Sequence, residues 1–158
     1  MYPQTHFLFP FLISLILMKY GLLDWKLALL SGMIGVLIDL DHLAEHIFHT
    51  RKNKFSLADT WNNAVHYHRF SERSVLHHWL GMLIIGFILM VVSFFNWKIS
   101  LMLAIAYYSH MILDHICIRV KPKYVLRLKE EGLFVQIPYY ELVFDGILVV
   151  GMVLLKFI

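Results

Sequence analysis

The chain has 158 residues, of which 59% are hydrophobic and only 16% are charged, against roughly 25% charged in soluble domains. This composition predicts an integral membrane protein and excludes a disordered chain or an ordinary soluble domain. The formal net charge is +3, and its excess sits in two loops without a nucleic-acid-binding motif, so we expect no nucleic-acid partner.

Five apolar runs with few charges predict about five membrane helices, because a span needs about 20 apolar residues. The runs cover residues 6–23, 27–42, 75–95, 98–118 and 142–158. Gly32 and Gly35 in the second run offer small surfaces for close helix contact. The length leaves no room for a separate soluble domain, so we predict one all-α integral membrane domain over residues 1–158. The first run lacks a leader's basic segment and cleavage signal, so we expect it to stay as a span.

Two polar segments lie between the predicted spans. Residues 43–74 follow the second run, and Ser56 to Asp59 has the pattern of a capped helix start. We expect a polar loop with a short surface helix there, long enough to gate a site. Residues 119–141 contain proline and glycine together with an alternating stretch at 133–137, which predicts a short extended or interfacial piece.

The basic residues predict the orientation of the chain. With five spans, ten of them fall on one side of the membrane and four on the other. The ten are Arg51, Lys52, Lys54, Arg69, Arg73, Arg119, Lys121, Lys123, Arg127 and Lys129, and the four are Lys19, Lys26, Lys98 and Lys156. Because cytoplasmic loops are enriched in lysine and arginine, we expect the first side and the N-terminus in the cytoplasm.

Four clusters of histidine and aspartate lie at the ends of the apolar runs. They are His6, the stretch from Asp39 to His42, the pair His77-His78, and the stretch from His110 to His115. In a five-span topology, all four clusters fall at the same cytoplasmic face. Such groups are costly in hydrocarbon unless they pair with one another, with a cation or with water. We therefore expect the clusters to form one shared site.

Helical spacing predicts which of these side chains share a face. Asp39 with His42, and His110 with Asp114, are three or four residues apart, so each pair presents a carboxylate and an imidazole on one face. On an ideal helix Asp41 points about 160° away from Asp39, so it joins the set only if the helix unwinds or if it bridges a second metal. The single cysteine excludes a Cys-rich zinc site. A set of histidines and carboxylates suits zinc, manganese or iron.

For several other polar residues, the sequence does not decide whether they belong to the site. Arg73 lies four residues before His77, where its planar charge suits an anionic group such as a phosphate, and an ordinary membrane anchor is equally consistent. Asp145 near the start of the fifth run is either a further carboxylate of the site or a routine first-turn residue. The sequence leaves open the roles of His46, His66, His68, His78 and His115.

The motifs, in this order, resemble those of a family of small membrane-bound metal-dependent hydrolases named after a LexA-regulated bacterial inner-membrane protein. The matching stretches are Thr5-His6, Ile38-Asp-Leu-Asp-His42, Arg73-Ser-Val-Leu-His77-His78 and Ser109-His110-Met-Ile-Leu-Asp114. The third departs most from the family pattern Arg-Gly-x-Thr-His-Ser, because Ser74, Leu76 and His78 replace its Gly, Thr and Ser. Ile38 also replaces the usual Pro. The resemblance implies hydrolysis of a lipid or of another phosphoester.

We therefore predict a membrane-embedded hydrolase at the cytoplasmic leaflet of the inner membrane, with membrane lipid as its environment and substrate. The expected metal ligands are His6, Asp39, Asp41, His42, His77, His110 and Asp114. They are expected to hold one or two divalent ions, zinc ahead of manganese or iron. Metal would lower the pKa of a bound water to about 7, Arg73 would steady negative charge, and Asp41 or Asp114 would take the proton. The sequence does not indicate the oligomeric state.

Three alternatives stay open. His110-x-x-x-Asp114, with an aspartate on another helix, resembles the zinc site of cation-diffusion transporters, although a transport site belongs near the membrane midplane. Ten histidines suggest a diiron lipid oxidase or hydroxylase, although only His42-x-x-x-His46 and the His77-His78 pair approach its histidine boxes. An architectural membrane protein with a structural metal would show metal-dependent stability and no turnover.

Overall fold

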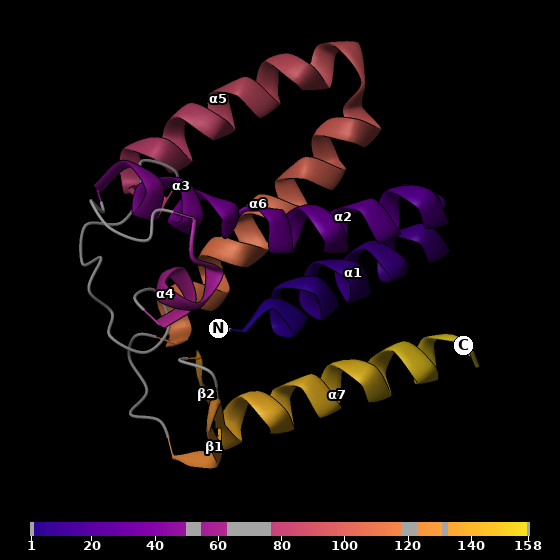
Figure 1. The fold of residues 1–158 in the computed structure, drawn as a ribbon. Helices are drawn as coiled ribbons and strands as arrows, with labels where there is room; N and C mark the ends of the chain where they lie inside the picture. The colour runs from indigo at the N-terminus through magenta and orange to yellow at the C-terminus, as the bar shows by residue number, and fades with distance from the viewer. Residues whose placement is uncertain (1, 50–54, 63–76, 118–122, 131–132, 158) are drawn as a thin grey trace.

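The computed structural model describes residues 2–49, 55–62, 77–117, 123–130 and 133–157 (Figure 1). Its helices are α1 (Pro3–Lys19), α2 (Trp25–Leu37), α3 (Leu40–His49), α4 (Leu57–Trp61), α5 (Trp79–Phe95), α6 (Trp97–Cys117) and α7 (Tyr139–Leu155). Strands β1 (Tyr124–Glu130) and β2 (Leu133–Pro138) pair antiparallel just before α7. The described residues are mostly helical and each predicted apolar run contains a helix, so the all-α class is confirmed.

Helix α1 stands at the centre of the arrangement. It packs against α2 on one side and α7 on another (Figure 1). Helix α6 crosses both α1 and α2, and α5 packs against α6. The chain reverses after α1 at Gly21, whose φ of 72° lies in the left-handed region that favours glycine. As a result α1 and α2 run in opposite directions, and the start of α1 meets the end of α2.

The contact between α1 and α2 depends on small residues. A Cβ added at Gly35 would lie 2.4 Å from the carbonyl oxygen of His6, and one added at Gly32 would lie 2.9 Å from ring carbons of Phe7. Inside α1, Pro10 has no N–H to donate to the carbonyl of His6 four residues earlier. Glycine at position 35 therefore lets the backbone of α2 approach this carbonyl directly.

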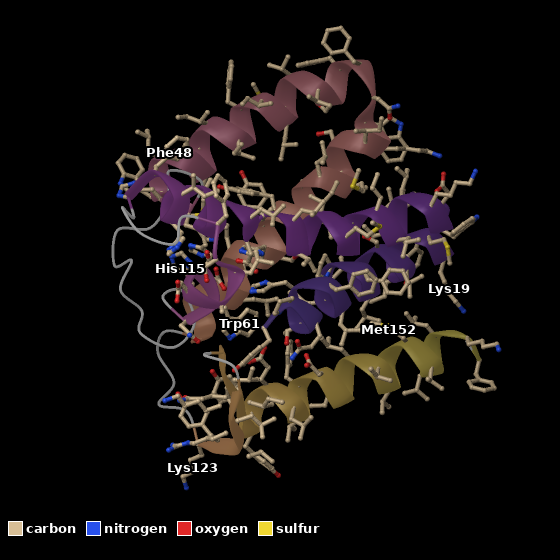
Figure 2. The ribbon with its side chains drawn as sticks, in the orientation of Figure 1. Lys19, Phe48, Trp61, His115, Lys123 and Met152 are labelled. Carbon is tan, nitrogen blue, oxygen red and sulfur yellow. The ribbon has the colours of Figure 1, made fainter. Side chains whose placement is uncertain are left out.

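The distribution of side chains is the reverse of that in a soluble domain. Small and polar groups fill the interior of α1 and α2, whose buried residues are Thr5, His6, Pro10, Ser14, Ala28, Ser31, Gly32 and Gly35. Large apolar side chains project outward from α5 and α7 (Figure 2), among them Leu83, Phe87, Val91, Phe94, Ile147, Val150 and Leu154. Close packing of small residues inside an apolar exterior is typical of helices in lipid.

The sequence also predicted that five of the helices cross the membrane. Among the described residues, Trp25–Phe48 is the one helical stretch both long and apolar enough to cross a membrane, and Trp79–Phe95 is apolar but shorter. Helices α1, α5 and α7 have 17 residues each, which at 1.5 Å per residue gives about 25 Å against a hydrocarbon core of about 30 Å. The five-span topology is therefore not confirmed.

Several element boundaries differ from the prediction. The second apolar run was expected to be helical to residue 42, but α2 ends at Leu37 and α3 begins at Leu40 after a turn. The short surface helix is confirmed as α4, where the Ser56 hydroxyl accepts a hydrogen bond from the Asp59 N–H at 3.1 Å. The extended stretch at 133–137 is confirmed as β2, and its partner β1 was not predicted. The expected gating loop began at residue 43, but residues 43–49 belong to α3. Its residues 50–54 and 63–74 lie outside the described residues.

Candidate metal centre

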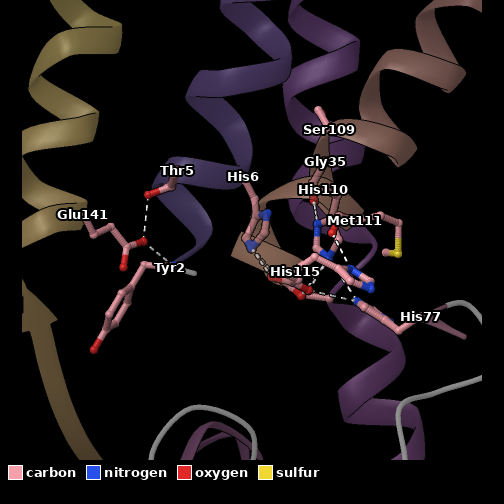
Figure 3. Close-up of polar contacts among 12 residues, drawn as sticks. Tyr2, Thr5, His6, Gly35, His77, Ser109, His110, Met111, His115 and Glu141 are labelled. Carbon is pink, nitrogen blue, oxygen red and sulfur yellow. Dashed lines mark hydrogen bonds and ion pairs between the residues drawn. The ribbon is translucent and has the colours of Figure 1, made fainter. Parts of the chain in front are cut away.

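Histidine and aspartate side chains from several separate segments meet at one end of the helices (Figure 3). His6 lies in the first turn of α1 and Asp39 in the turn after α2. His77 lies just before α5, and His110 lies near the end of α6. The remaining members of this set are His42 in α3 and Asp114 in the last turn of α6. The predicted meeting of the four clusters at one place therefore agrees with the geometry, whereas the role of each residue as a ligand stays a prediction.

One group of four side chains has the size of a metal site. Ligand atoms of His6, Asp39, His110 and Asp114 all lie within 4.8 Å of one another. The Nε2 atom of His110 lies 3.3 Å from Asp39 Oδ1 and 3.4 Å from Asp114 Oδ2, and His6 Nε2 lies 3.2 Å from Asp114 Oδ1. A tetrahedral zinc shell with bonds of about 2.0–2.1 Å puts neighbouring ligand atoms roughly 3.3 Å apart.

A second group lies beside the first and shares one member with it. It contains Asp39, His42 and His77, whose ligand atoms also lie within 4.8 Å of one another. His42 Nε2 lies 4.0 Å from Asp39 Oδ1, and the ring of His42 stacks on that of His77 with 5.1 Å between centroids. The described side chains therefore form two groups that could each hold a metal ion.

The hydrogen bonds of two histidines fix which ring nitrogen faces the site. His110 Nδ1 donates to the carbonyl oxygen of Gly35 at 2.8 Å, and His77 Nδ1 donates to Asp41 Oδ2 at 2.8 Å. In the neutral rings both Nε2 atoms then carry lone pairs, and they lie 3.1 Å apart. Two lone pairs this close require a proton or a cation beside them. Histidines that bind metals ordinarily donate their other N–H to a carbonyl or carboxylate in this way.

His6 gives a separate indication that the group is built for a cation. Its side chain is fully buried and its ring stacks on His110 with 4.0 Å between centroids. Within the part of the chain that the structure describes, neither of its nitrogens has a partner in hydrogen-bond geometry, although Nε2 lies at ion-pair distance, 3.2 Å, from Asp114 Oδ1. Buried polar atoms are nearly always satisfied, so this exception needs an explanation. A cation between His6 and the neighbouring Asp114 carboxylate would supply it.

The electrostatics at His77 also depend on the neighbouring carboxylates. Burial lowers the pKa of His77, but hydrogen bonds with Asp114 and Asp41 and the charge of these groups raise it, with a net result of about 9. In the absence of metal this ring is therefore protonated at neutral pH. The proton occupies the position in which a cation would otherwise balance the aspartates.

Asp41 is the predicted site residue whose place depends most on the backbone. It belongs to neither group, and its Oδ2 accepts the hydrogen bond from His77. On a continuous α-helix it would point away from Asp39, and the sequence predicted that it joins the site if the helix unwinds. The structure instead has a tighter turn, in which the N–H groups of Asp39, Asp41 and His42 donate to carbonyls three residues earlier, and Asp41 reaches His77 from this turn. A carboxylate in this position orients a ligand from outside the metal shell.

The other polar residues singled out from the sequence lie apart from the two groups or outside the described residues. His46 is buried in α3, and His78 is the exposed residue that precedes α5. His115 Nδ1 donates to the carbonyl of Met111 at 2.9 Å. Residues outside the described part of the chain are Arg73, His66 and His68.

One buried contact near the site was not predicted. The Thr5 hydroxyl lies 2.7 Å from Glu141 Oε1 and 2.7 Å from Asp145 Oδ1, and Glu141 also accepts a hydrogen bond from the backbone N–H of Tyr2. Asp145 thus contacts α1 rather than either metal group. The spacing of four residues between Glu141 and Asp145 puts both on one face of α7 and is the signal that could have revealed this contact.

Comparison with known proteins identifies the family of the chain. A family model described as YdjM inner membrane protein matches residues 1–119. No curated protein and no solved structure matches the chain. The matched residues include every side chain of both groups, whereas β1, β2 and α7 lie beyond them. The inner-membrane location of the family agrees with the membrane character expected from the composition. The chain belongs to the YdjM inner membrane protein family.

Proposed function

We propose that this protein is a metal-dependent hydrolase of the inner membrane that cleaves a lipid or another ester or phosphoester at the cytoplasmic leaflet. The observation that carries the proposal is the meeting of His6, Asp39, His110 and Asp114, from two helices and a turn, around one point. Mixed imidazole and carboxylate ligands are those of catalytic zinc sites in hydrolases. Zinc is the proposed metal, with manganese or iron as substitutes.

The proposed placement in the membrane follows from the surface of the molecule. Helices α1, α2, α5, α6 and α7 lie in the bilayer, and the exposed apolar side chains of α5 and α7 face lipid. The N-terminus and the metal centre face the cytoplasm, the side with most of the basic residues. The ligands lie at helix ends, which supports catalysis at head-group depth over transport through a site at the midplane.

The aspartates of the site are more exposed than the histidines, and this difference indicates the side from which the site is accessible. The side chains of His6 and His110 are fully buried, whereas those of Asp39 and Asp114 are 28% and 23% exposed. Water and substrate therefore approach from the side of the carboxylates, and the imidazoles lie on the buried side of the site. The hydrogen bond from His110 to the carbonyl of Gly35 fixes the orientation of the His110 ring there.

The chemistry divides between the metal and the protein. When bound, a divalent ion in this site acidifies a water molecule and polarises the scissile bond. The carboxylate that does not bind metal, Asp41 or Asp114, would accept the proton of the attacking water. Asp41 is the one that belongs to neither group of ligands. Arg73, four residues before His77, balances the negative charge of a phosphoester substrate.

A turnover assay on the full-length protein in detergent tests the proposal. The probes are bis(p-nitrophenyl) phosphate, p-nitrophenyl butyrate and a phosphatidylglycerol with a fluorescent acyl chain. We expect zinc-dependent hydrolysis of at least one probe, abolished by EDTA and reduced about 100-fold or more by Asp39→Asn or His110→Ala. The matched control is Asp24→Asn at the other end of α2, where asparagine caps a helix as well as aspartate does. Absence of metal-dependent turnover of all three probes by the zinc-loaded protein would contradict the proposal.

A further inference from the structure

The two groups of ligands contain more imidazoles than one ion needs. Four histidines, His6, His42, His77 and His110, contribute to the groups together with Asp39 and Asp114. A catalytic zinc ion ordinarily takes three protein ligands and a structural one takes four. Six candidate ligands within two overlapping groups are therefore too many for one ion and suit two.

The ligands form two overlapping groups, each of the size of one metal site. A single ion with bonds of about 2.0–2.2 Å cannot have ligand atoms more than about 4.4 Å apart. His6 and Asp114 fall in one group and His42 and His77 in the other, and His6 shares no group with either His42 or His77. His77 joins the two groups, since its Nε2 lies 3.1 Å from His110 Nε2 and 3.4 Å from Asp114 Oδ2. The ion of the second group therefore lies towards His42, which belongs to that group alone.

The two carboxylates face both sets at once. Asp39 Oδ1 lies 3.3 Å from His110 Nε2 and 4.0 Å from His42 Nε2, while its Oδ2 lies 4.0 Å from His6 Nε2. Asp114 Oδ1 lies 3.2 Å from His6 Nε2, and its Oδ2 lies 3.4 Å from His77 Nε2. Asp39 Oδ1 lies between His110 of the first group and His42 of the second, so this oxygen has the position of a bridge between two cations.

We infer that this protein holds a pair of divalent ions. One ion is bound by His6, Asp39, His110 and Asp114, the other by His42 and His77, and Asp39 bridges them. The inference rests on the proposed metal centre and deepens it. A pair of ions stabilises both the attacking and the leaving oxygens of a phosphoester during in-line displacement. The substrate class is therefore a phosphoester, in preference to a carboxylic ester.

Metal counting on the full-length protein tests the pair directly. Apoprotein is titrated with Zn²⁺ against a competing chelator, and bound zinc is measured by elemental analysis. We expect two ions per chain in the unaltered protein and one in His42→Ala. The side chain of His42 is 26% exposed, so we expect this variant to keep the fold. The control His78→Ala removes an exposed histidine that lies next to His77 and belongs to neither group, and it should keep both ions.

A spectroscopic measurement shows whether the two ions share a ligand. Loaded with Mn²⁺, the unaltered protein should give the electron paramagnetic resonance spectrum of an exchange-coupled pair. His42→Ala should give the spectrum of an isolated ion. A single ion per chain, two ions retained in His42→Ala, or two ions without coupling would each overturn the inference.

The outcomes separate this inference from the proposed function. One ion per chain with metal-dependent turnover overturns the pair and leaves the hydrolase. Two coupled ions without turnover of any probe support the pair and contradict the hydrolase. Hydrolysis of p-nitrophenyl butyrate without hydrolysis of either phosphoester probe overturns the assignment of substrate class.

Discussion

Gly35 contributes to the metal centre through its backbone alone. Its carbonyl accepts the hydrogen bond from His110, and its missing side chain makes room for the carbonyl of His6. Both contacts place imidazoles, so the residue acts on the centre without supplying a ligand.

Substitution of Gly35 by alanine should therefore disturb both the fold and the centre. The added Cβ would lie 2.4 Å from the His6 carbonyl oxygen, which forces α1 and α2 apart and costs about 1–3 kcal/mol of stability. We expect a lower melting temperature and weaker zinc binding, measured by thermal unfolding and chelator competition. Gly146→Ala is the control, because a Cβ at this position on α7 meets no atom within 4 Å. Equal behaviour of the two variants would show that the close helix contact is not needed.

Asp41 is predicted to position His77. Asn at this position keeps the acceptor for His77 Nδ1 and removes the charge that polarises the ring. We expect Asp41→Asn to keep its full complement of zinc but to bind it about 10–100-fold more weakly. Chelator competition with elemental analysis measures both quantities. Loss of an ion at saturating zinc would instead assign Asp41 as a ligand, as the sequence predicted.

The raised pKa of His77 predicts that zinc binding releases protons. With a pKa of about 9, the ring is protonated in the metal-free protein at pH 7 and must be neutral to bind zinc. Zinc affinity should therefore rise with pH from 7 towards 9, the range in which the free ring loses its proton. Calorimetric titration at pH 7 in buffers of different ionisation enthalpy counts the released protons. His77→Ala should release fewer of them, and an unchanged count would contradict the assignment.

At the scale of residues, the sequence predicted which carboxylates and imidazoles lie together but not the hydrogen-bond acceptors that orient the imidazole rings. The spacing from Asp39 to His42 and from His110 to Asp114 was enough to put a carboxylate and an imidazole together. The acceptors for His77 and His110 are Asp41 and the carbonyl of Gly35. A backbone carbonyl carries no sequence signal, and Asp41 reaches His77 only because the helix is interrupted.

At the scale of elements, α7 is held against α1 by a contact just outside the metal centre. Thr5, next to His6, donates its hydroxyl to the carboxylates that project from α7. The side chains of Thr5 and Glu141 are almost fully buried, so the contact is shielded from water. It fixes the first turn of α1, from which the side chain of His6 extends into the metal centre.

Replacement of Thr5 by valine should therefore loosen α7. Valine has nearly the same shape but leaves Glu141 without one of its donors, at a cost of about 1–3 kcal/mol. We expect a lower melting temperature and faster proteolysis between β2 and α7. Thr5→Ser restores the hydroxyl and should behave like the unaltered protein. Normal stability of Thr5→Val would show that packing alone holds the helix.

Element boundaries were predictable where local chemistry decides them. Ser56 accepts from Asp59 at the start of α4, as its side chain predicted. No proline or glycine lies between Val36 and Leu40, so the sequence did not reveal the break after Leu37. In β1, Leu126 and Leu128 alternate with Arg127 and Lys129, but its pairing with β2 is a contact that the local sequence does not contain.

At the scale of the whole molecule, the orientation in the membrane is predicted to put the metal centre in the cytoplasm. In a Cys117→Ser background, single cysteines replace Arg127 in β1, and Lys26 and Lys98 at the starts of α2 and α6, all of them exposed. An impermeant maleimide added outside intact spheroplasts should label positions 26 and 98 and spare position 127. Labelling of position 127 alone would reverse the orientation. Equal labelling of all three would contradict the five-span topology.

The membrane class followed from composition, and the convergence of the clusters followed from their shared side in a five-span topology. The relation of the two metal groups did not follow. It depends on how α1, α2 and α6 cross, and the contacts at Gly32 and Gly35 set the approach of α1 to α2. The sequence indicated small surfaces there but not which helices they join.

The most direct test of the metal centre is anomalous diffraction at the zinc absorption edge from crystals of the zinc-loaded, full-length protein. We expect anomalous density enclosed by His6, Asp39, His110 and Asp114, with a second peak beside His42 and His77. Well-ordered side chains at these positions with no anomalous density between them, or density confined to other residues, would contradict it.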